Sequence, residues 1–174
     1  MNRTPSKAPV LFVDVDGVIS LFGFSSNDSP PGSFHWVDGV VHCIDEACGP
    51  RLTRLAERFE LVWATGWEEK ANEYLPHLLR LEVPELPVVT FDGRAVFGSA
   101  HWKVEAIDEY ARGRPAAWVD DFLDEHCERW AAERREPTLL VRTESRSGLT
   151  DELVERLIEW ADSLGGGPGR AAAR

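Results

Sequence analysis

Two carboxylates one residue apart are the side chains best placed for chemistry in this chain of 174 residues. Asp14 and Asp16 follow the apolar residues 10–13, which predict a fully buried strand, and Gly17 comes next. Ligands of open α/β sheets bind at the carboxyl ends of the strands, so both acids are expected to face a crevice. Acids this close repel each other unless a cation lies between them, and their hard oxygen ligands favour Mg²⁺.

Two other structures would place acids at such a position. An EF-hand calcium loop needs more acids at regular spacing and a closing Glu between two helices, and neither feature is present around Asp14. An ordinary strand exit needs only solvated acids, and Asp16 would then cap the next element. The magnesium hypothesis therefore depends on whether the rest of the chain supplies matching groups.

Three later segments supply such groups, each at the end of an apolar run or at the start of a helical stretch. They are Thr65 and Gly66 after residues 61–64, Lys103 in residues 102–110, and Asp120 and Asp121 after residues 116–119. Together with the Asp14–Gly17 segment they resemble, in order, the four motifs of the haloacid dehalogenase (HAD) phosphatase superfamily. The resemblance covers about residues 9–145 and implies a HAD-like, Rossmann-like fold.

This resemblance implies a role for each matched residue. Asp14 would be the nucleophile that forms an aspartyl-phosphate, and Asp16 would protonate the leaving oxygen and then activate water. Lys103 would neutralise the phosphoryl group, while the Thr65 hydroxyl and the Gly66 amide would bind its oxygens. The metal ligands would be Asp14, the backbone carbonyl of Asp16, and Asp120 and Asp121.

Some of these positions have plainer explanations. Thr65 also suits the N-cap of the helix expected after it, and the two roles are compatible. Asp124 has the spacing of some variants of the fourth motif, but it equally suits the first turn of a helix. Three histidines lie in segments that can face the site, although solvated or hydrogen-bonded histidines are the commoner case: His35, His42 and His101.

The expected architecture is a three-layer α/β/α sandwich with a mainly parallel sheet, in which strands alternate with helices. One domain is expected over residues 9–164, between a disordered leader at 1–8 and a flexible tail at 165–174. The gaps between the motifs hold only elements that this core needs. No large cap domain is therefore expected, and the site should be open.

A β-hairpin flap is expected over residues 20–42, just after the first motif. Residues 20–31 are rich in Ser, Gly, Pro and Asn and predict a mobile loop, and an Asp38-Gly39 turn separates two short β-like runs. Pro76 is expected to break or kink the helix in which it lies. The remaining elements are helices at 50–59, 68–81, 102–110, 124–133 and 151–164, and strands at 86–91 and 138–142.

The composition limits the partners and the compartment. The formal net charge is −11 with three lysines, which disfavours a long nucleic acid as partner but leaves a local basic patch open. No apolar run approaches the roughly 20 residues that span a bilayer, and the first residues lack the apolar core of a signal peptide. A cytoplasmic protein without membrane contact is expected. Cys43, Cys48 and Cys127 lack metal-site spacing and should be small buried apolar side chains.

These observations predict a Mg²⁺-dependent phosphohydrolase that acts on a phosphorylated small molecule or on the phosphorylated end of a larger substrate. Residues 64–68, Ala-Thr-Gly-Trp-Glu, also look similar to HAD domains associated with RNA-repair proteins, so nucleic-acid end repair is the first alternative. A non-catalytic HAD-like binding module is the second, and the presence of both Asp14 and Asp16 argues against it. An open site is also compatible with a homo-oligomer in which a neighbouring subunit covers it.

Overall fold

Four parallel strands form the central sheet of the computed structural model, which describes residues 8–83 and 85–165. β1 lies in the middle, and its last residue, Val13, is level with Trp63 of one neighbouring strand and Val119 of the other. The residues that follow these three strands therefore meet at one end of the sheet. The order across the sheet is β5 (Glu60–Trp63), β1 (Val10–Val13), β6 (Ala116–Asp120) and β7 (Thr138–Arg142).

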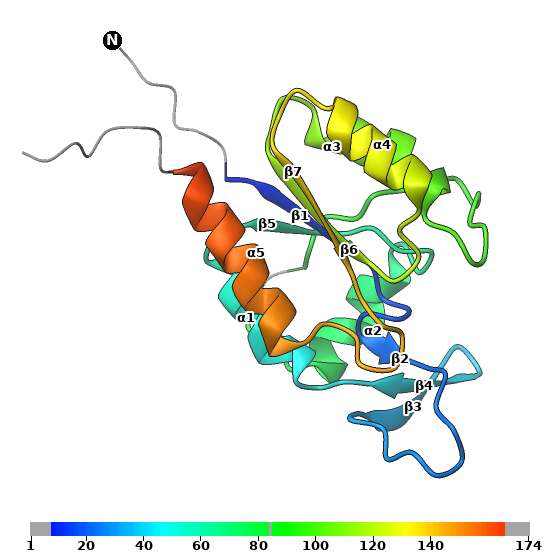
Figure 1. Cartoon of the computed structure of the whole chain (residues 1–174). Helices are drawn as coiled ribbons and strands as arrows, with labels where there is room; N and C mark the ends of the chain where they lie inside the picture. Colours follow the sequence, from blue (N-terminus) through cyan, green and yellow to red (C-terminus); the bar gives the residue numbers. More distant parts are fainter. Residues whose placement is uncertain (1–7, 84, 166–174) are drawn as a thin grey trace, which may run out of the picture.

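Helices cover both faces of this sheet (Figure 1). Side chains alternate along β1, so Leu11 and Val13 belong to one core and Val10 and Phe12 to the other. This is the three-layer α/β/α arrangement with a mainly parallel sheet that the sequence predicts. The first core packs against α1 (Cys48–Ala56), α2 (Lys70–Leu78) and α5 (Asp151–Leu164), and the second against α3 (Val104–Ala111) and α4 (Glu125–Glu133).

A small antiparallel sheet lies beside α2 and contains the predicted hairpin (Figure 1). Its order is β2 (Ser20–Leu21), β4 (Val40–Ile44) and β3 (Ser33–Val37). Both residues of the turn between β3 and β4 have positive φ angles, 50° at Asp38 and 79° at Gly39, as a tight hairpin turn requires. The Asp38 carboxylate accepts hydrogen bonds from Lys70 and Tyr74 of α2, which fixes the tip of the hairpin to the main body.

The helix expected at residues 68–81 is shorter than predicted. α2 begins at Lys70 because Glu68 has a φ of 48°, a left-handed conformation that does not start a right-handed helix. The helix continues through Pro76 and ends at Leu78, so the proline does not break it. Pro76 lies in the last turn, where the loss of one backbone hydrogen bond costs little further structure.

Two other predicted segments also differ from the structure. The prediction of a strand at residues 86–91 is wrong. In this segment only Val88 pairs with another strand, through an isolated bridge with Trp63. Pro87 has no N–H to donate and so interrupts the ladder. The loop expected at residues 20–31 begins later, since its first two residues form β2 and pair with β4.

The other predicted elements are confirmed. The bounds of β7 and α5 are identical to those predicted, and the helix expected at 102–110 starts with a 3₁₀ turn, η1 (His101–Lys103). All three cysteines are buried and free. No helix in the described ranges is long and apolar enough to cross a membrane. The expected leader and tail lie outside the described residues, apart from residues 8 and 165.

Thr150 gives the first test of this fold. Its hydroxyl caps α5 by accepting a hydrogen bond from the Leu153 N–H, and Thr150→Ala should lower the free energy of unfolding by about 1 kcal/mol. Thr53→Ala is the matched control, because the Thr53 hydroxyl only donates to the Gly49 carbonyl within α1 and its loss should change stability by less than about 0.5 kcal/mol. Urea denaturation measures both values, and equal losses would contradict the capping role.

Candidate active site

Three carboxylates converge at the carboxyl end of the central sheet. Asp14 follows β1, Asp120 is the last residue of β6, Asp121 follows it, and all three are buried. One carboxylate oxygen from each lies within 4.8 Å of the other two. The strand register produces this cluster, since the Asp14 N–H donates to the Val119 carbonyl of β6 at 3.0 Å. Mg²⁺ binds its ligands at about 2.1 Å, so only small side-chain movements separate this cluster from a shared ion.

A buried lysine links two of these carboxylates. Lys103 Nζ lies 2.6 Å from Asp120 Oδ2 and 3.1 Å from Asp14 Oδ1, and only 4% of its side chain is exposed. Lys103 is the last residue of η1, directly before α3. Charge-assisted hydrogen bonds are stronger away from water. The ammonium group therefore joins the ends of β1 and β6 from a third element of the chain.

The cluster carries more negative charge than its lysine neutralises. Burial is the main cause that raises the pKa of Asp14, to about 8, with Lys103 acting against it and Asp120 and Asp16 adding to it. Burial alone would lower the pKa of Lys103, but its two carboxylate partners outweigh burial and raise it. Burial also raises the pKa of Asp121. Three buried carboxylates around one ammonium group are a donor set that fits a divalent cation.

Asp16 lies at the mouth of the site, where 52% of its side chain is exposed. Trp67 Nε1 donates a hydrogen bond to Asp16 Oδ2 at 3.0 Å, and His42 Nδ1 lies 3.8 Å from Asp16 Oδ1. The His42 ring packs edge-on against Trp67 and is hydrogen-bonded to Ser20 Oγ at 2.8 Å. Partial desolvation raises the pKa of Asp16, although the hydrogen bond from Trp67 opposes the rise. The carboxyl group is thus held in place, and its pKa lies above the usual value of an aspartic acid.

Gly17 lets the loop after β1 pack directly on Asp121. Its φ is +75°, and a Cβ atom at this position would overlap the Asp121 carboxylate. Thr143 Oγ1 donates to the Gly17 carbonyl at 2.8 Å, and Ser145 Oγ donates to Asp121 Oδ2 at 2.7 Å. Thr143 and Ser145 both follow β7, so the end of a third strand also supports the cluster.

The predicted phosphate-binding residues follow β5 at the same end of the sheet. Gly66 lines the cavity described below, whereas Thr65 is fully buried and its hydroxyl accepts a hydrogen bond from the Trp67 N–H at 3.2 Å. The N-cap of α2 is Glu69, so the helix-cap alternative for Thr65 is wrong. For the same reason the Gly66 N–H lies in the turn before the helix and not at its terminus.

Asp124 belongs to the framework of α4. It is the N-cap of this helix, and its Oδ1 accepts hydrogen bonds from the backbone N–H groups of His126 and Cys127. His101 Nδ1 lies 2.9 Å from its other oxygen. Desolvation opposes these bonds, but together they hold the pKa of Asp124 at about 2. Of the two alternatives for Asp124, the structure supports the helix start.

Two cavities flank the hairpin, and one of them contains the carboxylate cluster. Asp14, Asp16, Lys103, Asp120 and Asp121 all line a cavity of about 510 Å³. Its other walls come from β2, β4, residues 95–99 and the residues around η1 and after β6. His42 is the one of the three candidate histidines that lines it.

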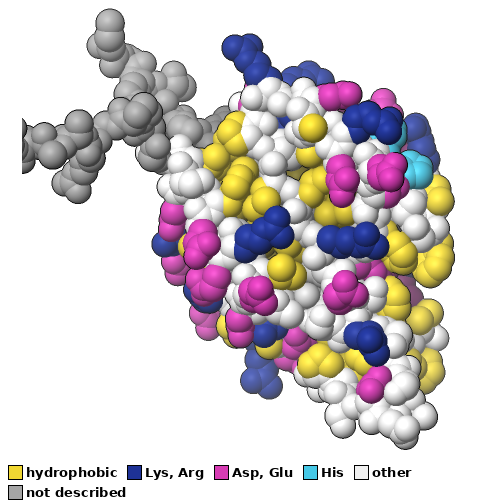
Figure 2. All heavy atoms as spheres, in the orientation of Figure 1, with side chains coloured by type: hydrophobic (Ala, Val, Ile, Leu, Met, Phe, Trp, Pro, Cys, Tyr) yellow, Lys and Arg dark blue, Asp and Glu magenta, His cyan; other side chains and the backbone are white. Residues whose placement is uncertain are grey.

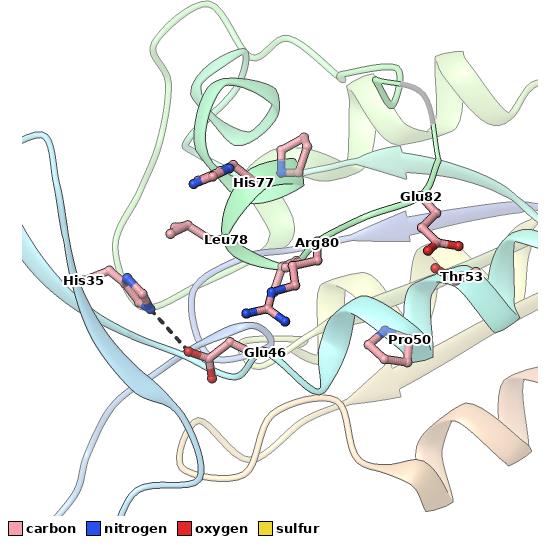
Figure 3. Close-up of a pocket in the computed structure, with 10 residues that line it drawn as sticks. His35, Glu46, Pro50, Thr53, His77, Leu78, Arg80 and Glu82 are labelled. Carbon is pink, nitrogen blue, oxygen red and sulfur yellow. Dashed lines mark hydrogen bonds and ion pairs between the residues drawn. The ribbon is translucent and has the colours of Figure 1, made fainter.

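The second cavity, of about 1000 Å³, lies between the hairpin, α1 and the end of α2 (Figure 3). Figure 3 shows His35 pointing toward Glu46, its partner at 3.3 Å, while the Arg80 side chain extends into the space between α1 and α2. The group of metal-ligating side chains found in the described part of the chain lies in the other cavity. The smaller cavity is therefore the candidate active site, and His35 is not part of it.

This combination of fold and site defines a HAD-like protein: a parallel α/β sheet with Asp14 and Asp16 after its central strand, acids after the next strand, and a buried lysine between them. The chain belongs to the family described as the HAD domain in Swiss Army Knife RNA repair proteins, whose model matches residues 10–154. The family membership confirms the resemblance inferred from the four motifs.

Two further comparisons carry no argument about function. The crystal structure of a hypothetical protein from Xanthomonas campestris matches with 14% sequence identity and a TM-score of 0.48, over 97% of this chain and 91% of that one. No match was found among the curated proteins.

Sequence reasoning missed three contributors to this site. Ser145 was detectable, because it follows β7 and the carboxyl ends of parallel strands meet. Trp67 donates its indole N–H to Asp16, a bond that the sequence does not reveal. Residues 95–99 form a wall of the cavity. This wall lies close to Gly66, since a Cβ atom added to Gly66 would be 3.6 Å from the Cβ atom of Ala95. The sequence gives no periodic signal for this segment.

Gly17→Ala tests the packing of the two loops. The added methyl group displaces Asp121, so Mg²⁺ should raise the Tm of the wild type but not that of the variant. Gly113→Ala is the matched control: Gly113 also has a positive φ, 71°, but nothing lies within 4 Å of its Cβ position. Both variants should lose about 1 kcal/mol to backbone strain, and only Gly113→Ala should keep the Mg²⁺ response in calorimetry. The same Mg²⁺ response in both would contradict the assignment.

Proposed function

We propose that this chain is a Mg²⁺-dependent hydrolase of phosphomonoesters that acts through an aspartyl-phosphate. The observation that carries the proposal is the convergence of Asp14, Asp120 and Asp121 around Lys103 in an open cavity. Membership of a HAD family supports the same chemistry. A non-catalytic binding module would have no use for Asp16, a second acid held at the cavity mouth by Trp67.

In the first step, an Asp14 carboxylate oxygen attacks the phosphorus atom and the bond from phosphorus to the leaving oxygen breaks. Asp16 gives its proton to that oxygen, so the product alcohol leaves neutral. The raised pKa of Asp16 supports this role, because the acid must carry a proton before the step. Trp67 keeps the carboxyl group oriented through its N–H.

In the second step, the Asp16 carboxylate takes a proton from a water molecule whose oxygen attacks the same phosphorus atom. The bond between phosphorus and Asp14 breaks, inorganic phosphate leaves and Asp16 is again protonated. The two steps together consume one water molecule and release one alcohol and one phosphate. Asp16 therefore acts as acid and then as base, and its half-exposed position suits contact with water.

The remaining residues hold charge in place. Lys103 neutralises the phosphoryl oxygens while it keeps Asp14 aimed at the substrate, and Asp120 orients Lys103. Asp14, Asp121 and the Asp16 carbonyl would hold the Mg²⁺ ion, which when bound offsets the repulsion between Asp14 and an anionic substrate. The Gly66 N–H would bind a phosphoryl oxygen from the cavity wall. The buried Thr65 hydroxyl accepts the Trp67 N–H and would reach a phosphoryl oxygen only after a local movement of this turn.

A second candidate is repair of a phosphorylated nucleic-acid end by the same chemistry. The description of the matching family and the Ala64–Glu68 segment favour it. The net charge of −11 weighs against tracking a long phosphate backbone, and on the face in Figure 2 basic and acidic side chains are interspersed without a basic stripe. Hydrolysis of 3′- and 5′-phosphorylated oligonucleotides, measured against the mononucleotides, tests this candidate. A higher kcat/KM for the oligonucleotides would support it.

The nucleophile is tested by Asp14→Asn. Hydrolysis of para-nitrophenyl phosphate should require Mg²⁺, stop with EDTA and return when Mg²⁺ is added back. Asp14→Asn should abolish it, because an amide is not a nucleophile for phosphorus at neutral pH. Asp28→Asn, which changes an acid outside the cavity, is the control and should keep full activity. A folded Asp14→Asn protein with wild-type turnover would refute the mechanism.

The role of Asp16 is tested with a series of leaving groups. General acid catalysis contributes about 10²–10⁴-fold when the leaving oxygen is strongly basic and little when it is a nitrophenolate. Asp16→Asn should therefore reduce kcat/KM much more for alkyl phosphates than for para-nitrophenyl phosphate. An equal loss across the series would mean that Asp16 positions the metal or the loop instead of moving a proton.

A further inference from the structure

The cavity has an apolar side that the proposed chemistry leaves unused. Acids and Lys103 line one part of it, and the other lining residues include six large apolar side chains: Leu21, Phe22, Val41, Val96, Phe97 and Phe122. A phosphoryl group and a metal ion gain nothing from hydrocarbon walls. The apolar side must therefore contact whatever carries the phosphoryl group.

Four of these six apolar side chains are open to solvent. Seven large hydrophobic side chains are exposed in the described part of the chain, and four of them line this one cavity: Phe22, Val41, Val96 and Phe97. Phe97 is 95% exposed, more than any of the others. Apolar surface that gathers at a cavity mouth and is not buried by folding typically marks a ligand groove.

Phe97 offers an open aromatic face. Its ring centroid lies 6.1 Å from that of Phe122, with the ring planes tilted by 57°, so the two rings do not cover each other. Gly98, the next residue, has a φ of +81° and nothing within 4 Å of its Cβ position. The chain thus turns directly after Phe97 and leaves this ring at the cavity mouth without a covering layer.

The charges around the cavity limit what this side can bind. Lys103 is the one lysine or arginine among the residues that line it, and both of its ion pairs are with carboxylates. A second phosphate or a carboxylate on the substrate would meet Asp16 and Asp121 with no cation left to pair with. Uncharged flat rings suit such a wall, because stacking on an aromatic side chain needs no charge.

We infer that the cavity selects phosphomonoesters whose alcohol part carries a flat uncharged ring, and that this ring stacks on Phe97 between the hairpin and residues 95–99. The inference rests on the proposed phosphatase function and adds a substrate class to it. A nucleoside monophosphate and an arylmethyl phosphate share this chemistry. Sugar bisphosphates and diphosphates are excluded as good substrates.

The test compares substrates with and without a ring. We expect a higher kcat/KM for adenosine 5′-monophosphate and benzyl phosphate than for ribose 5-phosphate and glycerol 2-phosphate. All four substrates release an alkyl alcohol, so a difference between them does not come from the leaving group. Phe97→Ala should reduce this ratio about tenfold, and Phe97→Trp should preserve it. Phe34→Ala is the matched control, since Phe34 is an exposed phenylalanine on the hairpin, 64% exposed, that does not line the cavity. A higher kcat/KM for adenosine 5′-monophosphate than for the simple aromatic phosphate would identify the ring as a nucleobase, and the reverse order would identify it as a simple aromatic ring.

A binding measurement separates this inference from the proposed function. In Asp14→Asn protein with Mg²⁺, calorimetry should show tighter binding of adenosine 5′-monophosphate than of ribose 5-phosphate, and the added variant Phe97→Ala should remove the difference. If this binding difference is found but the wild-type protein hydrolyses none of the substrates, the phosphatase function is refuted and the ring-binding site is supported. Turnover with equal kcat/KM for all four substrates, or an unchanged ratio in Phe97→Ala, would overturn the ring site and keep the function.

Discussion

The ion pairs of Lys103 hold together the two strand ends on which the site depends. A buried ammonium group costs several kcal/mol in lost hydration, and it persists only where carboxylates satisfy it. Asp14 and Asp120 do so at 3.1 and 2.6 Å from two neighbouring strands. Because both partners are buried as well, removal of Lys103 would leave two carboxylates inside the protein without their cation. The same interaction thus positions Asp14 and constrains the fold around it.

The excess of acids is the second constraint, and it follows from the topology. Parallel strands deliver all their following residues to one end of the sheet, so acids after β1 and β6 meet whether or not their charges favour it. Lys103 neutralises part of this negative charge. Ser145 donates a hydrogen bond to Asp121, and Thr143 donates one to the Gly17 carbonyl. The remaining negative charge is an electrostatic reason for the cluster to bind a divalent cation.

The sequence predicts the strands and helices that position this site better than it predicts the residues that line the cavity. Periodic apolar runs bounded by turn residues predict β1, β7 and α5, and the order of the motifs predicts that Lys103 belongs to the same site as the acids after the two strands. The sequence does not reveal local backbone geometry. The left-handed conformation of Glu68 moves the start of α2 to Lys70, and Pro87 prevents the expected strand. Residues 95–99 line the cavity without regular structure, and a segment without periodicity gives no signal of where it lies.

The two halves of the cavity are therefore supported in different ways. The polar half is fixed by strand register, buried ion pairs and the close contact between Gly17 and Asp121. The apolar half depends on a hairpin tied to α2 through Asp38 and on residues 95–99, which precede η1. A substitution at an exposed wall position such as Phe97 leaves the buried ion pairs intact, whereas a change at Lys103 removes the ion pairs of the polar half. This separation lets the substrate preference vary in such a fold while the arrangement of carboxylates stays the same.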